Sequence, residues 1–261
     1  MTTQRITQRQ LAFRADFRSR IAQAYSGPGH VALIAVIGLA AIWVCARQIN
    51  HPAWYEWLVI PAAFCISNTF EWWIHRFVMH RPRKGLMGIY KRHTLAHHQF
   101  FTDIEPTLDN TRDFRIVFFP PYALVAFIGL SIPPAAILYA IGAPNAAWLL
   151  IITNVALYLN YELFHYCCHV KDDRIVRHIP LVNSIRRHHI AHHNTAIMME
   201  RNFNLTYPIA DWFFGTSDLR CGLLKHIFNG YDQTDVVHGL KRVRNTVDDP
   251  RVGHVRTMAA E

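Results

Sequence analysis

Charged residues and recognisable cysteine patterns are both scarce in this chain. Only 17% of its 261 residues are charged, and its five cysteines show neither zinc-finger nor redox spacing, so we expect no disulfide framework. The His-Glu-x-x-His run of zincin hydrolases is absent. We expect no secretory signal peptide, because the first apolar run begins near His30, behind a long polar arm without a small-residue cleavage site.

Apolar residues, in contrast, are abundant and gathered into runs. Hydrophobic residues make up 51% of the chain, and four runs approach the roughly 20 residues that a helix needs to cross a bilayer. They are residues 31–46, 54–73, 116–141 and 146–159, and the third contains two Pro-Pro pairs. We predict an all-α, multi-pass membrane helical bundle with about four transmembrane helices and a cytoplasmic helical cap.

The net charge of +9 has a ready explanation in membrane topology, so no nucleic-acid partner is expected. Residues 1–29 hold five Arg, residues 74–114 hold seven Lys and Arg, and the chain after Val170 holds 13, whereas the connections 48–53 and 142–145 hold none. Basic residues favour the cytoplasmic side. The pattern therefore predicts that both termini and the segment between the second and third runs face the cytoplasm.

Histidine is the residue that the chain has in excess. Most of its 17 histidines fall into four groups, all on the predicted cytoplasmic side. The groups are His75 and His80; His93, His97 and His98; His165 and His169; and His188, His189, His192 and His193. Neutral imidazole is the commonest nitrogen ligand of transition metals. Four groups on one face predict a shared metal site. Either His188 or His189 can be the first ligand of the fourth group, and we choose His189.

Helical geometry suggests how many ions the groups hold. On an α-helix, residues four apart differ in heading by about 40°, so His165 aligns with His169 and His93 aligns with His97. Residues five apart splay by about 140°, so His75 and His80 need a helix end, a local unwinding or two different metals. An adjacent pair such as His97-His98 cannot easily grip one ion but can serve two ions. The recurring adjacent pairs therefore point to two metals.

The ligand type narrows the metal to iron or zinc, with copper less well suited. Carboxylates are expected to orient the rings through hydrogen bonds, and the candidates are Glu71, Asp103, Glu162 and Asp211. The run Glu162-x-x-His165 matches a di-iron carboxylate motif but occurs once, so a carboxylate-bridged cage is disfavoured. Thiolate ligation by Cys167 or Cys168 is a weaker alternative.

The order of these groups resembles the fatty acid hydroxylase and sterol desaturase superfamily of membrane-bound di-iron oxygenases. The stretch from Asn202 to Thr216, which contains Asp211 and ends in Phe-Gly-Thr, is also similar to that family, and the likeness covers residues 54–216. The resemblance implies that two iron ions, for which zinc can substitute in purified protein, are held by ten histidines. These are His75, His80, His93, His97, His98, His165, His169, His189, His192 and His193.

By this resemblance the chain is an O2-dependent enzyme that hydroxylates an unactivated C–H bond of a fatty acyl, sphingolipid or sterol-type substrate. The alternatives are a lipid desaturase on the same metal site, a bis-histidine haem electron carrier, and a zinc hydrolase or metal transporter. The expected partners are the lipid, the membrane and a separate electron donor, which is a cytochrome b5-like protein, a ferredoxin or a reductase.

Three domains are predicted. Residues 1–29 form a basic amphipathic arm, which lies on the membrane surface or is a solvated helix or frayed tail. Residues 30–216 form the transmembrane bundle and di-metal catalytic domain. Residues 217–261 form a cytoplasmic C-terminal tail.

Overall fold

The computed structural model describes residues 2–237; most of the predicted tail, residues 238–261, lies outside the described residues. In the described part all named elements are helical, and the single β pairing is an isolated bridge between Leu219 and Val236. The all-α prediction is therefore confirmed for these residues. The chain forms two compact units. We call them the bundle unit (Ile21–Phe70 and Asn110–Leu163) and the histidine unit (Met1–Arg20, Glu71–Asp109 and Phe164–Glu261).

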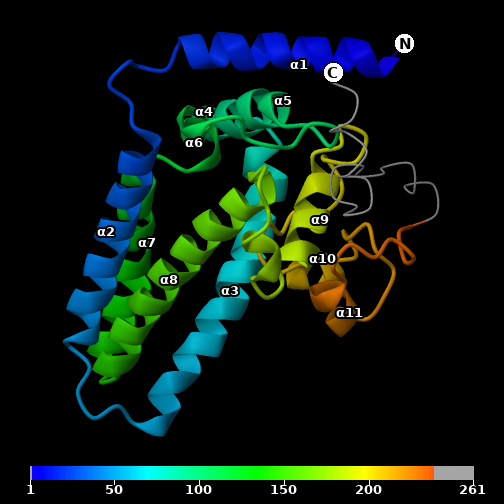
Figure 1. The fold of residues 1–261 in the computed structure, drawn as a ribbon. Coiled ribbons are helices and arrows are strands. Elements are labelled where there is room, and N and C mark those ends of the chain that lie inside the picture. The colour runs from blue at the N-terminus through cyan, green and yellow to red at the C-terminus, as the bar shows by residue number, and fades with distance from the viewer. Residues whose placement is uncertain (1, 238–261) are drawn as a thin grey trace. The chain divides into compact units, whose positions relative to one another are not determined.

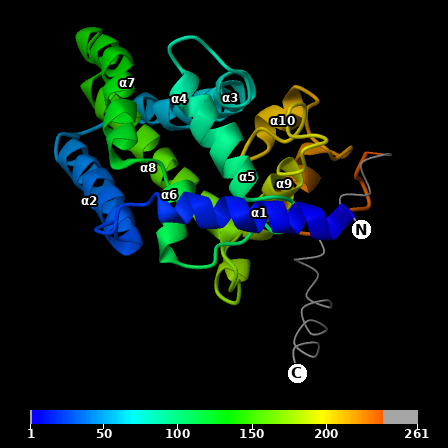
Figure 2. The ribbon, with the colours of Figure 1, turned by 90° about the horizontal axis from the view of Figure 1, so that it is seen from above.

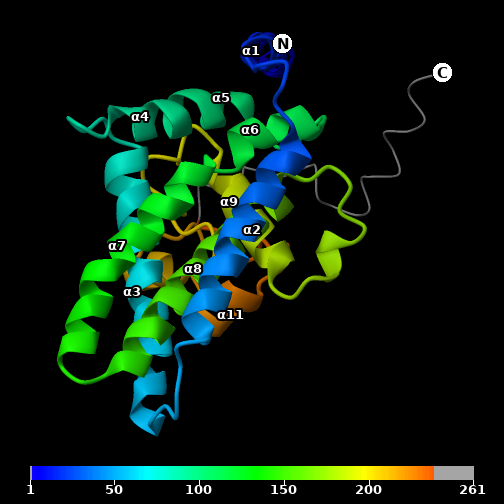
Figure 3. The same cartoon turned by 90° about the vertical axis from the view of Figure 1, so that its left-hand side faces the viewer.

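The bundle unit consists of long apolar helices. Its elements are α2 (Gly27–Ala46), the 3-10 helices η1 (Trp54–Leu58) and η4 (Thr111–Asp113), α6 (Phe114–Val117), α7 (Pro121–Ala140), and most of α3 (Val59–Ile74) and α8 (Pro144–His169). Helix α2 lies beside α7 (Figures 1 and 3). The two Pro-Pro pairs occupy different positions in α7. Pro121 starts the helix, where the backbone N–H has no intrahelical partner in any case, whereas Pro133 and Pro134 lie inside the helix.

Within residues 2–237, three segments are long and apolar enough to cross a membrane: Gly27–Ala46, Thr111–Ala140 and Pro144–His169. The remaining predicted run contains α3, whose 16 residues give a length of about 24 Å, short of the roughly 30 Å of a hydrocarbon core. Helix α3 is continued by η1 before it and by a π-helical turn after it. The four-span arrangement stays a prediction.

Several polar groups in the bundle unit form hydrogen bonds with one another. The Glu56 carboxylate accepts hydrogen bonds from Asn145 Nδ2 at 2.9 Å and from the Ala146 amide at 3.2 Å, and so caps the start of α8. Asn154 Nδ2 donates to Ser131 Oγ at 3.0 Å. Such pairing is required where no water reaches the backbone or the side chains.

The histidine unit is built from short helices and loops. They are α1 (Thr2–Ser19), the π-helices η2 (His75–Met79) and η3 (Lys91–His97), α4 (Met87–Tyr90), α5 (His98–Phe100), the 3-10 helix η5 (Val176–His178), α9 (Val182–His192), α10 (Ile209–Phe213) and α11 (Leu223–Phe228). Helix α1 runs beside α5 (Figures 1 and 2), and α11 contacts both α9 and α10.

Helix α1 has a buried polar face. Gln10 and Arg14, one turn apart on the same face, are buried and bound to backbone carbonyls of residues 100–105. This face of α1 therefore packs onto the histidine unit.

The start of α2 provides a test of packing in the bundle unit. Ser26 caps the helix by accepting a hydrogen bond from the Gly29 amide at 3.1 Å, and a Cβ atom on Gly27 would lie 1.9 Å from the Thr111 carbonyl oxygen. Gly27→Ala should therefore push the two backbones apart and lower the free energy of unfolding by about 1–3 kcal/mol. Thermal unfolding in detergent checks this. Gly129→Ala is the matched control, because nothing lies within 4 Å of its added methyl group.

Candidate metal centre

Two π-helical turns set the direction of five histidine rings. In η2 the His80 amide donates to the His75 carbonyl at 3.1 Å, and in η3 the His98 amide donates to the His93 carbonyl. A π-turn bonds residue i to residue i+5, so residues five apart come to lie one above the other. His75 therefore aligns with His80, and His93 aligns with His98. The rings of His93 and His97, which the sequence predicted to align, do stack with centroids 5.3 Å apart, but their ligand nitrogens belong to different sets. Of the three arrangements considered for His75 and His80, the local unwinding is present.

The rings converge in two buried sets whose candidate ligand atoms lie within 4.8 Å of one another. The first histidine group is His75, His80, His93, His98 and His192, and the second histidine group is His97, His165, His169 and His189. The adjacent residues His97 and His98 are divided between the two groups, as the sequence predicted for adjacent pairs.

His193, the tenth predicted ligand, is outside both sets but close to each. Its Nε2 atom lies 3.0 Å from His189 Nε2 in the second group, and its ring stacks on His98 of the first group with centroids 4.4 Å apart. The structure thus brings all ten predicted histidines into one buried cluster within the histidine unit.

Backbone carbonyls hold the outer nitrogen of several rings. In the second group His169 Nδ1 lies 2.7 Å from the Pro106 carbonyl oxygen, and Nδ1 of the neighbouring His193 lies 3.0 Å from that of Phe101. In the first group His192 Nδ1 lies 2.8 Å from the Arg201 carbonyl oxygen, and His75 Nδ1 bonds to that of Phe203. A carbonyl oxygen accepts and cannot donate, so each Nδ1 carries the proton and each Nε2 offers a lone pair.

His80 takes the same tautomer by another route. The Thr94 hydroxyl donates to the Met79 carbonyl oxygen at 2.7 Å, so its oxygen is left to accept from His80 Nδ1 at 3.4 Å. His80 Nε2 and His192 Nε2 then face each other at 2.8 Å without a proton between them. Two lone pairs at that distance repel unless a cation lies between them.

The spacing of these nitrogens fits a transition-metal ion. Imidazole nitrogens bind zinc at about 2 Å, which puts neighbouring ligand atoms about 3 Å apart. The recorded Nε2–Nε2 separations within the groups run from 2.8 Å for His75 and His93 to 3.3 Å for His97 and His165. The residues present therefore fit a metal in both groups.

Burial keeps these rings in the neutral form that metals bind. It lowers the pKa of His75 to about 4 and that of His193 to about 3. Burial also lowers the pKa of His93, His97 and His189 well below the ordinary value, and neighbouring histidines lower it further. Uncharged imidazoles are thus available at neutral pH.

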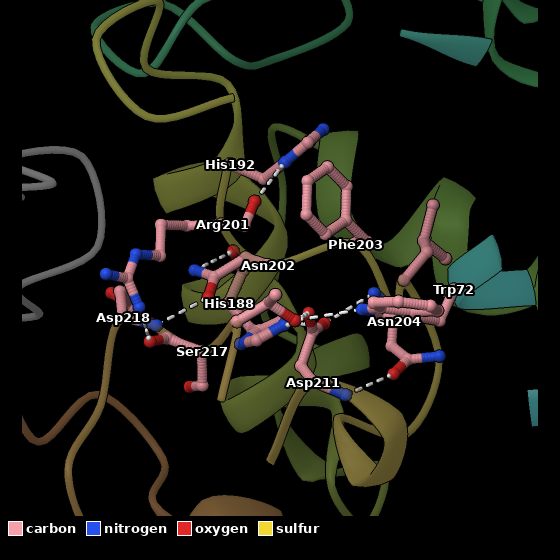
Figure 4. Close-up of polar contacts among 12 residues, drawn as sticks. Trp72, His188, His192, Arg201, Asn202, Phe203, Asn204, Asp211, Ser217 and Asp218 are labelled. Carbon is pink, nitrogen blue, oxygen red and sulfur yellow. Dashed lines mark hydrogen bonds and ion pairs between the residues drawn. The ribbon is translucent and has the colours of Figure 1, made fainter. Parts of the chain in front are cut away.

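The choice between His188 and His189 follows from where their rings lie. His189 is in the second group, whereas His188 Nε2 lies 3.0 Å from Asp211 Oδ2, away from both groups (Figure 4). Asp211 also accepts from Thr216 Oγ1 at 2.6 Å and from the Asn204 amide at 2.6 Å. Asp211 is fully buried and ties the segment 201–216 to α9.

A second set of polar contacts joins helix α9 to residues 202–218 (Figure 4). Arg187 of α9 forms a two-pronged ion pair with Asp218, at 2.7 and 2.9 Å, and both side chains are buried. The Asp218 amide donates to Asn202 Oδ1 at 2.8 Å, and Asn202 Nδ2 donates to the His188 carbonyl oxygen at 3.1 Å. These bonds position the Arg201 and Phe203 carbonyls that face the first histidine group.

The carboxylates predicted to orient the rings have other partners. Glu71 accepts from the Thr206 amide at 2.9 Å, Asp103 accepts from Asn194 at 3.1 Å, and Glu162 accepts from the Phe119 amide at 3.1 Å. Asp211 binds His188 rather than a member of either group. Sequence reasoning missed the backbone carbonyls that take this role, because every residue carries a carbonyl and no side-chain pattern marks which one faces a ring.

Thiolate ligation finds no support in the described residues. Cys167 and Cys168 are buried in α8, but neither belongs to a histidine group, and all five cysteines of the chain are free.

Comparison with known proteins identifies one family. The sequence model of a family described as fatty acid hydroxylase matches residues 60–216. No curated protein and no solved structure matches the chain. The matched segment contains all ten histidines of the cluster, whereas α1 lies outside it.

The Arg187–Asp218 pair predicts a dependence of stability on pH. Burial raises the pKa of Asp218, but the charge of Arg187 outweighs this and holds it below its ordinary value of 3.8. Asp218→Asn should lower the free energy of unfolding by about 3–5 kcal/mol at neutral pH, because it leaves a buried guanidinium unpaired. A carboxylate whose pKa is lower in the folded than in the unfolded protein stabilises the fold at pH values above its unfolded pKa, here 3.8. This stabilisation is lost as Asp218 becomes protonated, so the difference in melting temperature between wild type and variant should shrink as the pH falls below 3.8. A constant difference would contradict the assignment.

Replacing Asp211 should weaken metal binding by the first histidine group in particular. In Asp211→Asn, an amide NH2 group would face the donors of His188 or Asn204, and the segment carrying the Arg201 and Phe203 carbonyls would shift. We expect the affinity for a first-group metal to fall about 10–100-fold, the range seen when outer partners of metal ligands are removed. Metal titration of the purified protein measures it. The exposed Asp172→Asn variant, which should bind as wild type, is the control.

Proposed function

The chain belongs to the fatty acid hydroxylase family, and on that premise we propose that it is a membrane-bound, non-haem di-iron oxygenase that hydroxylates an unactivated C–H bond of a lipid. The observation that carries the proposal is the pair of imidazole groups, each with nitrogens aimed at one point. The ten histidines of the cluster are the proposed ligands, with one ion in each group. When bound, iron supplies the O2 chemistry that no amino-acid side chain provides.

The residues of the chain have their own tasks in this reaction. Imidazole ligands suit both iron and zinc, and we propose iron because of the family; zinc is the expected substitute in purified protein. The burial of all ten rings keeps bulk water from the metal site, which protects an oxidising centre from side reactions. The carbonyl-bound Nδ1 atoms fix the ring directions before a metal arrives, so little reorganisation is needed on binding.

The substrate enters from the membrane in this proposal. Apolar side chains such as Leu39, Trp43 and Ile137 are exposed on α2 and α7, as expected for surfaces that contact lipid tails. We propose a multi-pass protein with four spans, with both termini and the metal site facing the cytoplasm. We also propose that residues 30–216 contain the transmembrane bundle and all metal ligands, with residues 1–29 as an arm before them and residues 217–261 as a tail.

Other functions fit the site less well. Desaturation of a lipid would use the same two metals, so it differs from hydroxylation only in the product. A bis-histidine haem needs two rings on opposite faces of a flat macrocycle, whereas five rings of the first group surround one point. Electrons for oxygen activation would come from a separate cytochrome b5-like protein, ferredoxin or reductase.

Lipid analysis of cells that express the chain tests the proposal. Wild type should produce a lipid that has gained one oxygen atom, and His192→Ala should abolish it because the variant removes a first-group ligand. His178→Ala, which removes an exposed histidine outside both groups, should leave the product unchanged. A product that has lost two hydrogens instead identifies a desaturase. Identical lipid profiles for wild type and His192→Ala would refute both lipid reactions.

A further inference from the structure

The second histidine group depends on a loop that we call the carbonyl loop, residues 101–109. Its Phe101 and Pro106 carbonyls accept the Nδ1 protons of His193 and His169. The loop grips His169 at two further points: the Leu108 amide donates to the His169 carbonyl oxygen at 2.8 Å, and the Phe101 ring stacks on the His169 ring with centroids 4.0 Å apart. The direction of these two imidazoles therefore follows the conformation of the carbonyl loop.

Helix α1 holds the backbone just before each of these carbonyls. Arg14 Nε donates to the Phe100 carbonyl oxygen and Arg14 Nη2 to the Glu105 carbonyl oxygen, both at 2.8 Å. Gln10 Nε2 lies 2.8 Å from the same two oxygens and is placed to donate to both. Phe100 and Glu105 directly precede Phe101 and Pro106. Only the φ and ψ angles of one residue separate each held carbonyl from the carbonyl that faces a ring, so α1 restricts the positions of both ring-facing carbonyls.

Arg14 is a buried charged residue with several specific contacts. The side chain is 1% exposed, forms an ion pair with Asp109 at 3.2 Å, and lies over the Phe100 ring at 4.8 Å. A guanidinium is buried only where its donors are satisfied, and a surface helix needs no such arrangement. Gln10 reinforces the same contacts by accepting from Thr102 Oγ1 at 3.1 Å.

We propose that Gln10 and Arg14 are positioning residues of the second histidine group, so that α1 is a working part of the metal centre. The inference rests on the proposed function, since it assumes that the group holds iron. It also goes beyond the family, because the matched segment begins at residue 60 and does not include α1. The two groups then have separate outer supports: residues 201–218 for the first and α1 with the carbonyl loop for the second.

Iron binding by the full-length protein tests this proposal. Wild type, Arg14→Gln, Gln10→Leu and Arg20→Gln are purified in detergent and titrated with ⁵⁷Fe, and the two sites are followed by Mössbauer spectroscopy. Arg14→Gln should lower iron affinity about 10–100-fold at one site and leave the other site unchanged. Arg20 directly follows the same helix, and its side chain is 72% exposed, so Arg20→Gln should behave as wild type. Asp211→Asn should alter the opposite site.

Each outcome has a distinct meaning. Unchanged iron binding and unchanged spectra in Arg14→Gln would overturn the proposal. An equal loss of iron affinity at both sites, in a variant with the melting temperature of wild type, would also overturn it. If Arg14→Gln does not fold, Gln10→Leu decides, because it removes hydrogen bonds without leaving a buried charge unpaired. A wild type that binds no iron would refute the proposed function itself, which separates that failure from the failure of the α1 assignment.

Discussion

The hydrogen bond between an imidazole Nδ1 and a backbone carbonyl is the interaction on which the histidine unit depends. It places the proton on the outer nitrogen of His75, His169, His192 and His193, and so leaves Nε2 free to bind a metal. Without a cation, such inward lone pairs repel one another, as the 2.8 Å separation of His80 and His192 illustrates. A metal ion bound by these lone pairs would remove the repulsion, so the arrangement suits a metal site.

The π-turns explain how a short segment serves two groups. In η3 the extra residue in the turn aligns His93 with His98 and leaves His97 pointing to the other group. A regular α-helix would not bring His93 and His98 together, because residues five apart differ in heading by about 140°. The wider turn is thus tied to the division of ligands between the two groups, and it places adjacent residues in different sets.

Holding backbone carbonyls in place requires strong supports, and these are charged groups sealed from water. Asp211 and the Arg187–Asp218 pair hold the segment that faces the first group. Arg14 holds the loop that faces the second group. Buried charges are expensive unless they are fully paired, so they force a single geometry on the surrounding chain. The bundle unit has a different task, since its exposed apolar helices are suited to lipid.

The sequence alone determined the helical class, the apolar runs and the identity of the clustered histidines, because hydrophobic length and residue type are local properties. It also indicated two ions, from adjacent histidines that cannot share one. Tertiary structure decided the partners of the rings. Which of His97 and His98 shares a histidine group with His93 depends on a π-turn. Which carbonyl faces His169 depends on a loop held by Arg14, more than 80 residues away in the chain. Such contacts join distant segments through backbone atoms that are the same in every residue, so no local pattern records them.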